Sequence, residues 1–390
     1  MKTSKTPLSL VLALALAMML GPFSLDTYLP AFPAIGADLG APASAVALTV
    51  SVYIFTLAAS QLLGGALSDR HGRRTVLLAG LGIYAAASLG IAAARTLPVM
   101  IGGRALQALG GGWVLVSVPA LVRDRVSGRE AAKLFSLLGL IMVLAPGVAP
   151  SVGSALLEAG SWRWIFLALA GYAALLAPLT QRFIFRDLPR REPETGPVPS
   201  LGRRYLDVFA ERAALPYIVW QTAVFSVLMI FVTNASAIYQ GHFRQDERMF
   251  SLLFAANVAA MVVFNLANRA LLARYPSRAI LRAATLVLGA GMLWLVTAAL
   301  ARWPLAAFVP GMMLTLGSMG AISPNNQACY LEHFPRNGGT AAALLGATQF
   351  SVAGAMSAFS TRLPETLTAV VLAMAVCAAV AVGVMIFSDE

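Results

Sequence analysis

Twelve long apolar runs, separated by charged residues, Pro and Gly, dominate this 390-residue sequence. A bilayer core about 30 Å thick needs roughly 20 apolar residues per helix. Because 59% of the residues are hydrophobic and only 12% are charged, a water-soluble fold would be coated in hydrocarbon. The sequence therefore predicts an all-α integral membrane protein with twelve transmembrane helices. In approximate bounds, the runs are 8–35, 44–67, 75–94, 98–122, 131–157, 162–184, 213–239, 250–272, 279–301, 304–326, 339–361 and 365–387.

The first run has an alternative interpretation as a secretory signal. Lys2 and Lys5 precede an Ala/Leu stretch that contains small residues suited to cleavage. The apolar stretch nevertheless continues through Pro22 and Phe23, beyond a usual signal core, and the later runs need no removable leader. We therefore favour a first membrane span.

The surplus of basic residues predicts the orientation of the chain. There are 28 Lys and Arg against 17 Asp and Glu, a formal net charge of +11. With the N-terminus inside, 21 of the basic residues fall on inner connections, 6 on outer connections, and Arg104 within a span. This distribution follows the positive-inside rule, which predicts that both termini are cytoplasmic. Since topology explains the surplus, we expect no nucleic-acid partner.

One connection separates the runs into two groups of six. Residues 186–212 are rich in Arg, Glu and Pro, whereas the other connections are short. The halves also repeat weakly, because the Ser-Val-Pro of 117–119 corresponds to the Ile-Ser-Pro of 322–324. Such a duplication is typical of secondary transporters. We predict an N-terminal six-helix bundle over 1–185, a cytoplasmic linker over 186–212 and a C-terminal six-helix bundle over 213–390.

The sequence lacks the signatures of several enzyme classes. It has no GxxxxGK[ST] phosphate loop, which argues against nucleotide hydrolysis within the chain. Its three histidines are scattered and show no metal-ligand spacing. No paired acids, histidine cluster or nucleophile with a base is apparent within the runs. We therefore expect neither an enzyme nor a bound metal or cofactor.

The connection between the second and third runs, GGALSDRHGRRTVLL, concentrates charge at a helix end. Its carboxylate among three guanidiniums can form bidentate pairs that join neighbouring helices. One glycine lets helices approach closely, and a second suits a turn too tight for a Cβ. A solvated, positively charged loop is the alternative. The residues concerned are Gly65, Asp69, Arg70, Gly72, Arg73 and Arg74.

The order G-x-L-x-D-R-x-G-R-R in this connection resembles the loop signature of the major facilitator superfamily. The resemblance extends over essentially the whole chain and implies a fold of two pseudo-symmetric six-helix bundles. It also implies that the loop acts as a cytoplasmic gate. The corresponding loop of the second half, LLARYPSRAILR, keeps the basic residues but lacks the acid.

Two charged residues lie well inside predicted spans, away from the span ends. Arg104, Gln107 and Gly110 form the order R-x-x-Q-x-x-G, which resembles a fourth-span motif of superfamily antiporters whose Arg is tied to proton coupling. Asp26 is the one acid of the first run, and we expect it at a depth comparable to that of Arg104. A carboxylate beside an arginine in a water-poor site is suited to taking up and losing a proton. The alternatives place both residues at the outer surface, with Arg104 snorkelling.

Further resemblances favour export. Pro146 and Gly147 belong to a Gly/Pro-rich stretch of the fifth run that resembles an exporter signature, although a kinked packing helix explains it equally well. The stretches DTYLPAFP, SWRWIFLALAGYAALL and LEHFPRNGGTAAALLGATQF resemble the Bcr/CflA subfamily of bacterial inner-membrane drug:proton antiporters. That resemblance implies a proton gradient as the energy source and antibiotic resistance as a role.

Polar and aromatic residues within the spans are the candidate substrate contacts. A substrate of such folds binds near the midplane between the halves, although helix-to-helix hydrogen bonds would explain any single residue as well. With apolar walls and few charges, the cavity is suited to neutral or lipophilic compounds. The candidates are Tyr28, Tyr53, Gln107, Trp113, Asn234, Tyr239 and Gln349.

These features predict a monomeric, multi-pass inner-membrane exporter of small amphipathic compounds that exchanges them for protons by alternating access. One alternative is an exporter of an endogenous metabolite, amino-acid derivative or siderophore, or a symporter for uptake. A membrane sensor or scaffold is a second alternative, but it would need a soluble module, and the linker at 186–212 is too short and proline-rich to form one.

Overall fold

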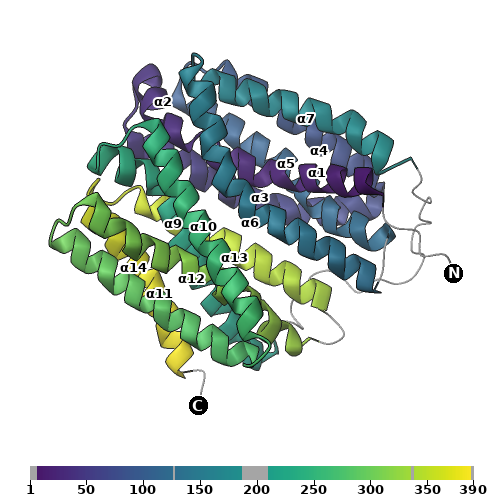
Figure 1. The fold of residues 1–390 in the computed structure, drawn as a ribbon. Coiled ribbons are helices and arrows are strands. Elements are labelled where there is room, and N and C mark those ends of the chain that lie inside the picture. Colours follow the sequence, from purple (N-terminus) through teal and green to yellow (C-terminus); the bar gives the residue numbers. More distant parts are fainter. Residues whose placement is uncertain (1–6, 126–127, 187–209, 335–337, 388–390) are drawn as a thin grey trace. The chain divides into compact units, whose positions relative to one another are not determined.

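The computed structural model describes residues 7–125, 128–186, 210–334 and 338–387. In these ranges the regular secondary structure is entirely helical, as predicted (Figure 1). Contacts between Cα atoms divide the chain into two compact units. Unit 1 comprises Met1–Pro42 and Thr56–Thr195, and unit 2 comprises Ala43–Phe55 and Gly196–Glu390. Most of the predicted linker, residues 187–209, lies outside the described ranges.

Unit 1 is built from long helices with short connections. Within it, α1 packs against α5, α6 and α7, and α4 packs against α5 and α7. The helix α3 contributes to both units, since its first residues group with unit 2. The elements are α1 (Leu8–Asp26), η1 (Leu29–Ala31), α2 (Phe32–Leu39), α3 (Ala43–His71), α4 (Arg73–Ala92), α5 (Leu97–Arg125), α6 (Gly128–Glu158) and α7 (Arg163–Phe183).

Unit 2 repeats this pattern of long helices. Its α9 packs against α12, α13 and α14, while α11 packs against α12 and α14. One turn, η3, is a π-helix that follows directly on α9. The elements are η2 (Arg212–Ala214), α9 (Leu215–Ser236), η3 (Ala237–His242), α10 (Glu247–Leu271), α11 (Ser277–Leu300), α12 (Leu305–Glu332), α13 (Gly338–Ser360) and α14 (Leu367–Phe387).

Ten helical stretches of the described residues are long and apolar enough to cross a membrane. They correspond to ten of the twelve predicted runs, and the other two runs form α6 and α13. Large apolar side chains remain exposed along these helices, for example Leu167 and Leu175 on α7. Exposed apolar surface of this kind indicates contact with lipid. The arrangement of twelve spans in two bundles stays a prediction.

The first span differs from the single helix predicted over 8–35. The helix α1 ends at Asp26, and a 3₁₀ turn leads into α2, which continues to Leu39. Proline explains the break, because Pro30 lacks the N–H that would bond the Asp26 carbonyl in a continued α-helix, and its ring would clash with that carbonyl. The break places Asp26 at the end of a helix.

Candidate functional site

Asp26 and Arg104 lie buried inside unit 1. The Asp26 side chain is 5% exposed and Arg104 is 0% exposed. Among the side chains that the structure describes, no other Asp, Glu, Lys or Arg is buried. The Asp26 carboxyl lies within range of an electrostatic interaction with the Arg104 guanidinium. Such burial is the opposite of what a snorkelling arginine or a surface carboxylate would show.

Two of the candidate substrate contacts hold Arg104. Its Nη1 donates a hydrogen bond to Oε1 of Gln107, one turn further along α5. Its Cζ lies 4.4 Å from the ring centroid of Tyr28, which is a cation–π contact. Since Tyr28 follows directly on α1, these contacts fix the guanidinium between α5 and the end of α1. Tyr28 and Gln107 therefore position the charged pair.

The polar network continues into α4 through residues that the sequence alone does not single out. Gln107 Nε2 donates to Ser88 Oγ over 2.7 Å, and Ser88 Oγ donates to the Tyr84 carbonyl over 2.8 Å. The Tyr84 hydroxyl forms a hydrogen bond with Ser24 of α1. Tyr84 and Ser88 are four residues apart in an apolar run, so they share one helix face. This spacing of two polar residues within an apolar run is the sequence signal that indicates a shared polar contact.

The helix α6 approaches the charged pair through a glycine. A Cβ on Gly153 would overlap the carbonyl oxygen of Thr27 and lie 2.7 Å from its carbonyl carbon. Thr27 directly follows Asp26, so Gly153 allows α6 to pack against the helix break. Pro146 and Gly147 lie on the same helix and are half-buried. The Gly/Pro-rich stretch thus contributes to the surroundings of Asp26.

We predict that Gly153→Ala lowers the stability of unit 1 by about 1–3 kcal/mol, the usual cost of overpacking. The clash is with backbone, which cannot rotate away as a side chain could. Thermal unfolding of the purified protein in detergent measures the effect. The control is Gly171→Ala on α7, since a Cβ there meets nothing within 4 Å. Equal unfolding temperatures for the two variants would contradict the prediction.

The charged loop joins helices within unit 1. Gly72 has φ 88°, a conformation that favours glycine, and it separates α3 from α4 as predicted. Arg73 forms an ion pair with Asp124 of α5 at 3.4 Å and donates to Ser68 at 3.0 Å. Arg74 Nη2 donates to Gln181 Oε1 of α7 at 3.5 Å. Arg70 is exposed, and the side chain of Asp69 lies outside the described part of the structure.

Close packing of α3 occurs one residue away from the predicted position. A Cβ on Gly65 would meet Val116 at 3.9 Å, an ordinary contact, whereas a Cβ on Gly64 would lie 2.7 Å from Trp113. Gly64 is therefore the glycine that faces α5 most closely. The two glycines differ because neighbouring residues of a helix point about 100° apart. Trp113 is half-buried, and its indole nitrogen finds no partner among the described residues.

The remaining candidates belong to unit 2, and two of them, Asn234 and Tyr239, form neutral hydrogen bonds. Asn234 Nδ2 donates to Ser360 Oγ over 2.8 Å, and Asn257 Nδ2 donates to the Tyr239 hydroxyl over 3.0 Å. Tyr239 is fully buried in the π-helical turn η3. Gln349 of α13 is half-buried, and Tyr53 is buried in the part of α3 that groups with unit 2.

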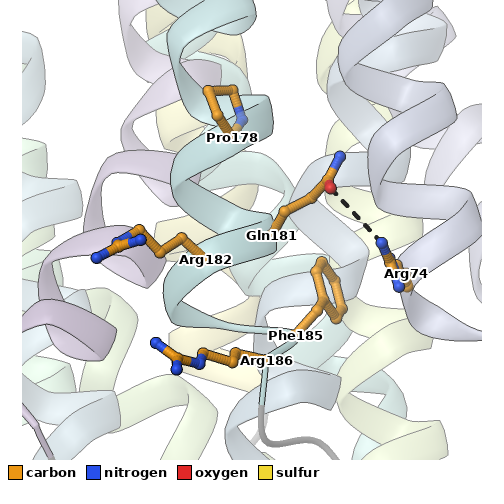
Figure 2. Close-up of a pocket in the computed structure, with 6 residues that line it drawn as sticks. All are labelled: Arg74, Pro178, Gln181, Arg182, Phe185 and Arg186. Carbon is orange, nitrogen blue, oxygen red and sulfur yellow. Dashed lines mark hydrogen bonds between the residues drawn. The ribbon is translucent and has the colours of Figure 1, made fainter.

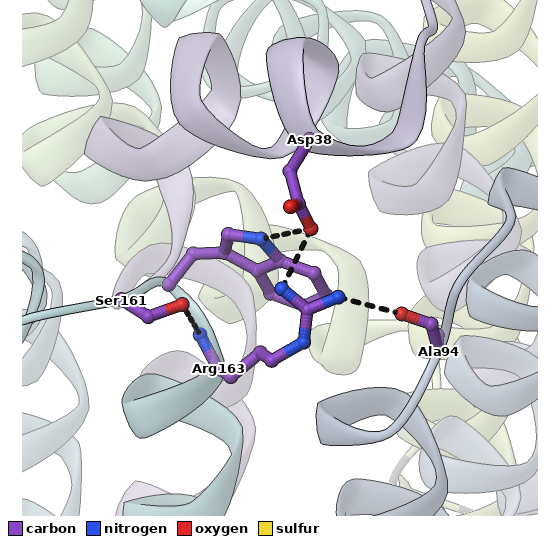
Figure 3. A network of polar contacts seen from close by, with 5 residues as sticks. Asp38, Ala94, Ser161 and Arg163 are labelled. Carbon is purple, nitrogen blue, oxygen red and sulfur yellow. Dashed lines mark hydrogen bonds and ion pairs between the residues drawn. The ribbon is translucent and has the colours of Figure 1, made fainter.

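A second polar network, absent from the sequence predictions, ties three helix ends of unit 1 together (Figure 3). Asp38 Oδ2 accepts hydrogen bonds from Arg163 Nη1 over 2.6 Å and from Trp162 Nε1 over 3.1 Å. Arg163 Nη2 donates to the Ala94 carbonyl over 3.0 Å. These contacts connect α2, the end of α4 and the start of α7. An aspartate so far from its partners in sequence gives no local signal of such pairing.

The family model of the Major Facilitator Superfamily matches residues 14–358. The chain belongs to the Major Facilitator Superfamily. Solved structures agree in fold: a D-xylose–proton symporter gives a TM-score of 0.77 over 98% of this chain and 97% of that chain, at 15% identity. A peptide transporter, solved with sulfate, also gives a TM-score of 0.77, over 97% of this chain and 93% of that chain, at 15% identity.

Curated relatives carry names from drug resistance. A bicyclomycin resistance protein homolog of Haemophilus influenzae is 27% identical over 390 residues, covering 98% of this chain and 96% of the relative. A chloramphenicol resistance protein of Pseudomonas aeruginosa is 34% identical over 258 residues, covering 64% of this chain and 60% of the relative. The predicted resemblance to the Bcr/CflA subfamily is confirmed. This superfamily member is a multi-pass inner-membrane protein with a role in transport.

Proposed function

We propose that this superfamily member exports small amphipathic compounds, drugs among them, across the bacterial inner membrane in exchange for protons. Both termini are cytoplasmic in this proposal, and twelve spans form two bundles that expose the site to each side in turn. The single observation that carries it is the buried Asp26–Arg104 pair, because no other charged side chain that the structure describes is buried. The resistance proteins among the relatives support the substrate class.

The charged pair supports coupling by a simple mechanism. When Asp26 takes up a proton, the pair loses its negative member, and Arg104 keeps its charge because a guanidinium stays protonated. Arg104 is held by Gln107 and Tyr28, and Gln107 continues to α4 through Ser88. Protonation thus changes the charge balance where α1, α4 and α5 meet. A change of helix packing follows from it in the proposed cycle.

The neutral interior of unit 2 supports uncharged or lipophilic substrates. Its buried polar side chains, in the described residues, are Ser, Thr, Asn and Gln, with no acid or base among them. Gln221 of α9 illustrates this: its Nε2 donates to Ser323 over 3.3 Å, while its buried Oε1 has no partner in the described part of the chain. Such an oxygen is available to a substrate donor.

Proteoliposomes with an acidic lumen and an internal pH-sensitive dye test the proposal. When an exported compound is added outside, its entry should drive protons out, so the luminal pH should rise. Antiport raises the luminal pH whichever way round the protein is inserted in the vesicle membrane. A symporter would carry protons inward with the compound and lower the luminal pH. A fall in luminal pH, or an unchanged luminal pH with every compound that enters, would overturn the proposal. Protein-free vesicles are the control.

A further inference from the structure

A basic cavity lies where the start of α4 meets the end of α7 in unit 1. It is open to the surroundings and has a volume of about 490 Å³. Figure 2 shows its lining around the last turn of α7, with Arg74 reaching in from the first turn of α4. The lining residues are Arg74, Pro178, Gln181, Arg182, Phe185 and Arg186.

Three guanidiniums give this cavity its charge. Arg74 donates to a neutral partner, Gln181 Oε1, and the Cζ of Arg182 lies 5.8 Å from the ring of Phe183. Arg182 and Arg186 extend to the same flank of α7, on the side away from Arg74 (Figure 2). Among the described side chains, no carboxylate forms an ion pair with any of the three. The cavity therefore attracts an anion.

The rest of the lining is apolar and points to an occupant with a hydrocarbon part. Pro178 and Phe185 adjoin the guanidiniums. Leu175, Pro178 and Arg182 are three and four residues apart, so they share one face of α7. Leu175 is 58% exposed, as expected for a side chain that faces lipid. A ligand with an anionic head at Arg182 and a chain along Leu175 matches this face.

We propose that this cavity binds the headgroup of an anionic phospholipid of the inner leaflet. Arginine binds phosphate through paired hydrogen bonds, and basic pockets between helices on the cytoplasmic side of a membrane bind anionic headgroups. A volume of about 490 Å³ lies in the range of small-molecule sites and accommodates a phosphoglycerol group. The leaflet follows from the orientation proposed above, in which α4 begins and α7 ends at the cytoplasmic side.

Lipid binding to the purified full-length protein in detergent tests the site without any transport measurement. Native mass spectrometry would count bound phosphatidylglycerol, with phosphatidylcholine of the same chains as the zwitterionic comparison and inorganic phosphate as the free anion. We expect phosphatidylglycerol to bind preferentially. Arg182→Gln/Arg186→Gln should weaken phosphatidylglycerol binding by about thirtyfold, because each arginine contributes about a fivefold effect. The double variant Arg182→Lys/Arg186→Lys should retain most of the phosphatidylglycerol binding, because it keeps both positive charges.

The matched control is Arg269→Gln/Arg274→Gln, which removes two exposed arginines outside the cavity. Three results would overturn the proposal: equal binding of the two lipids by the wild type, the same weakening in the control variant, or phosphate binding as tightly as phosphatidylglycerol. The last would mark a plain anion site. A protein that binds lipid as expected but moves no protons would instead count against the proposed transport function alone.

Discussion

Replacing Asp26 with asparagine is expected to abolish proton-driven accumulation of substrate while the protein stays folded. With one proton exchanged per substrate, a pH gradient of one unit supports an accumulation ratio of about ten, because about 1.4 kcal/mol corresponds to a factor of ten. The amide of asparagine cannot bind and release a proton, so the ratio should fall to about one. Uptake of a labelled compound into proteoliposomes with an acidic lumen measures it.

The matched control for this prediction is Asp246→Asn. Asp246 is an exposed residue whose Oδ1 accepts the Met249 N–H over 2.8 Å and caps α10. Asparagine caps a helix as well as aspartate does, so this variant should accumulate substrate like the wild type. If Asp26→Asn kept the full accumulation ratio, Asp26 would not be the coupling residue. Exchange of labelled for unlabelled compound without a gradient confirms that the variant still binds substrate.

Replacing Arg104 with glutamine is expected to lower both stability and transport. The change leaves the buried Asp26 without its counter-charge and removes the contacts with Gln107 and Tyr28. Removing one member of a buried charged pair costs about 3–5 kcal/mol. Thermal unfolding in detergent and the accumulation assay measure the two effects. Arg95→Gln, at an exposed arginine before α5, should change neither.

A double-variant cycle separates the charge interaction from packing. In Asp26→Asn/Arg104→Gln no buried charge remains unpaired, so the double variant should be less destabilised than the sum of the single variants. It should nevertheless fail to accumulate substrate, because the protonatable group is gone. Additive effects on stability would show that the two side chains act independently. That result would contradict the proposed charged pair.

Much of the fold was predictable because a membrane span is recognised from the hydropathy of about 20 consecutive residues. Ten predicted runs correspond to helical stretches long enough to cross a membrane, with bounds that shift by a few residues. Gly72 was predictable for a similar reason, since a turn between two helices demands a backbone conformation that glycine tolerates. The break after Asp26 was signalled by Pro30 but was missed within a continuous apolar run.

The candidate site was predictable only in part. Asp26 and Arg104 were selected because charge within an apolar run is costly and therefore conspicuous. Ser24, Tyr84 and Ser88 were missed, because each is common inside spans and only their contacts across α1, α4 and α5 set them apart. Gly64 was passed over for Gly65, since the sequence does not show which of two adjacent glycines faces the neighbouring helix.

By itself, the sequence determined the class of this protein: an inner-membrane chain of apolar helices with superfamily motifs and two charges in costly positions. Hydropathy and charge act residue by residue, so they can be read along the chain. Only the tertiary structure decided that Arg104 lies over Tyr28, that Gly153 meets the backbone after Asp26, and that Arg74 of α4 bonds Gln181 of α7 beside one cavity. Each of these contacts joins separate helices, and packing alone selects which faces meet.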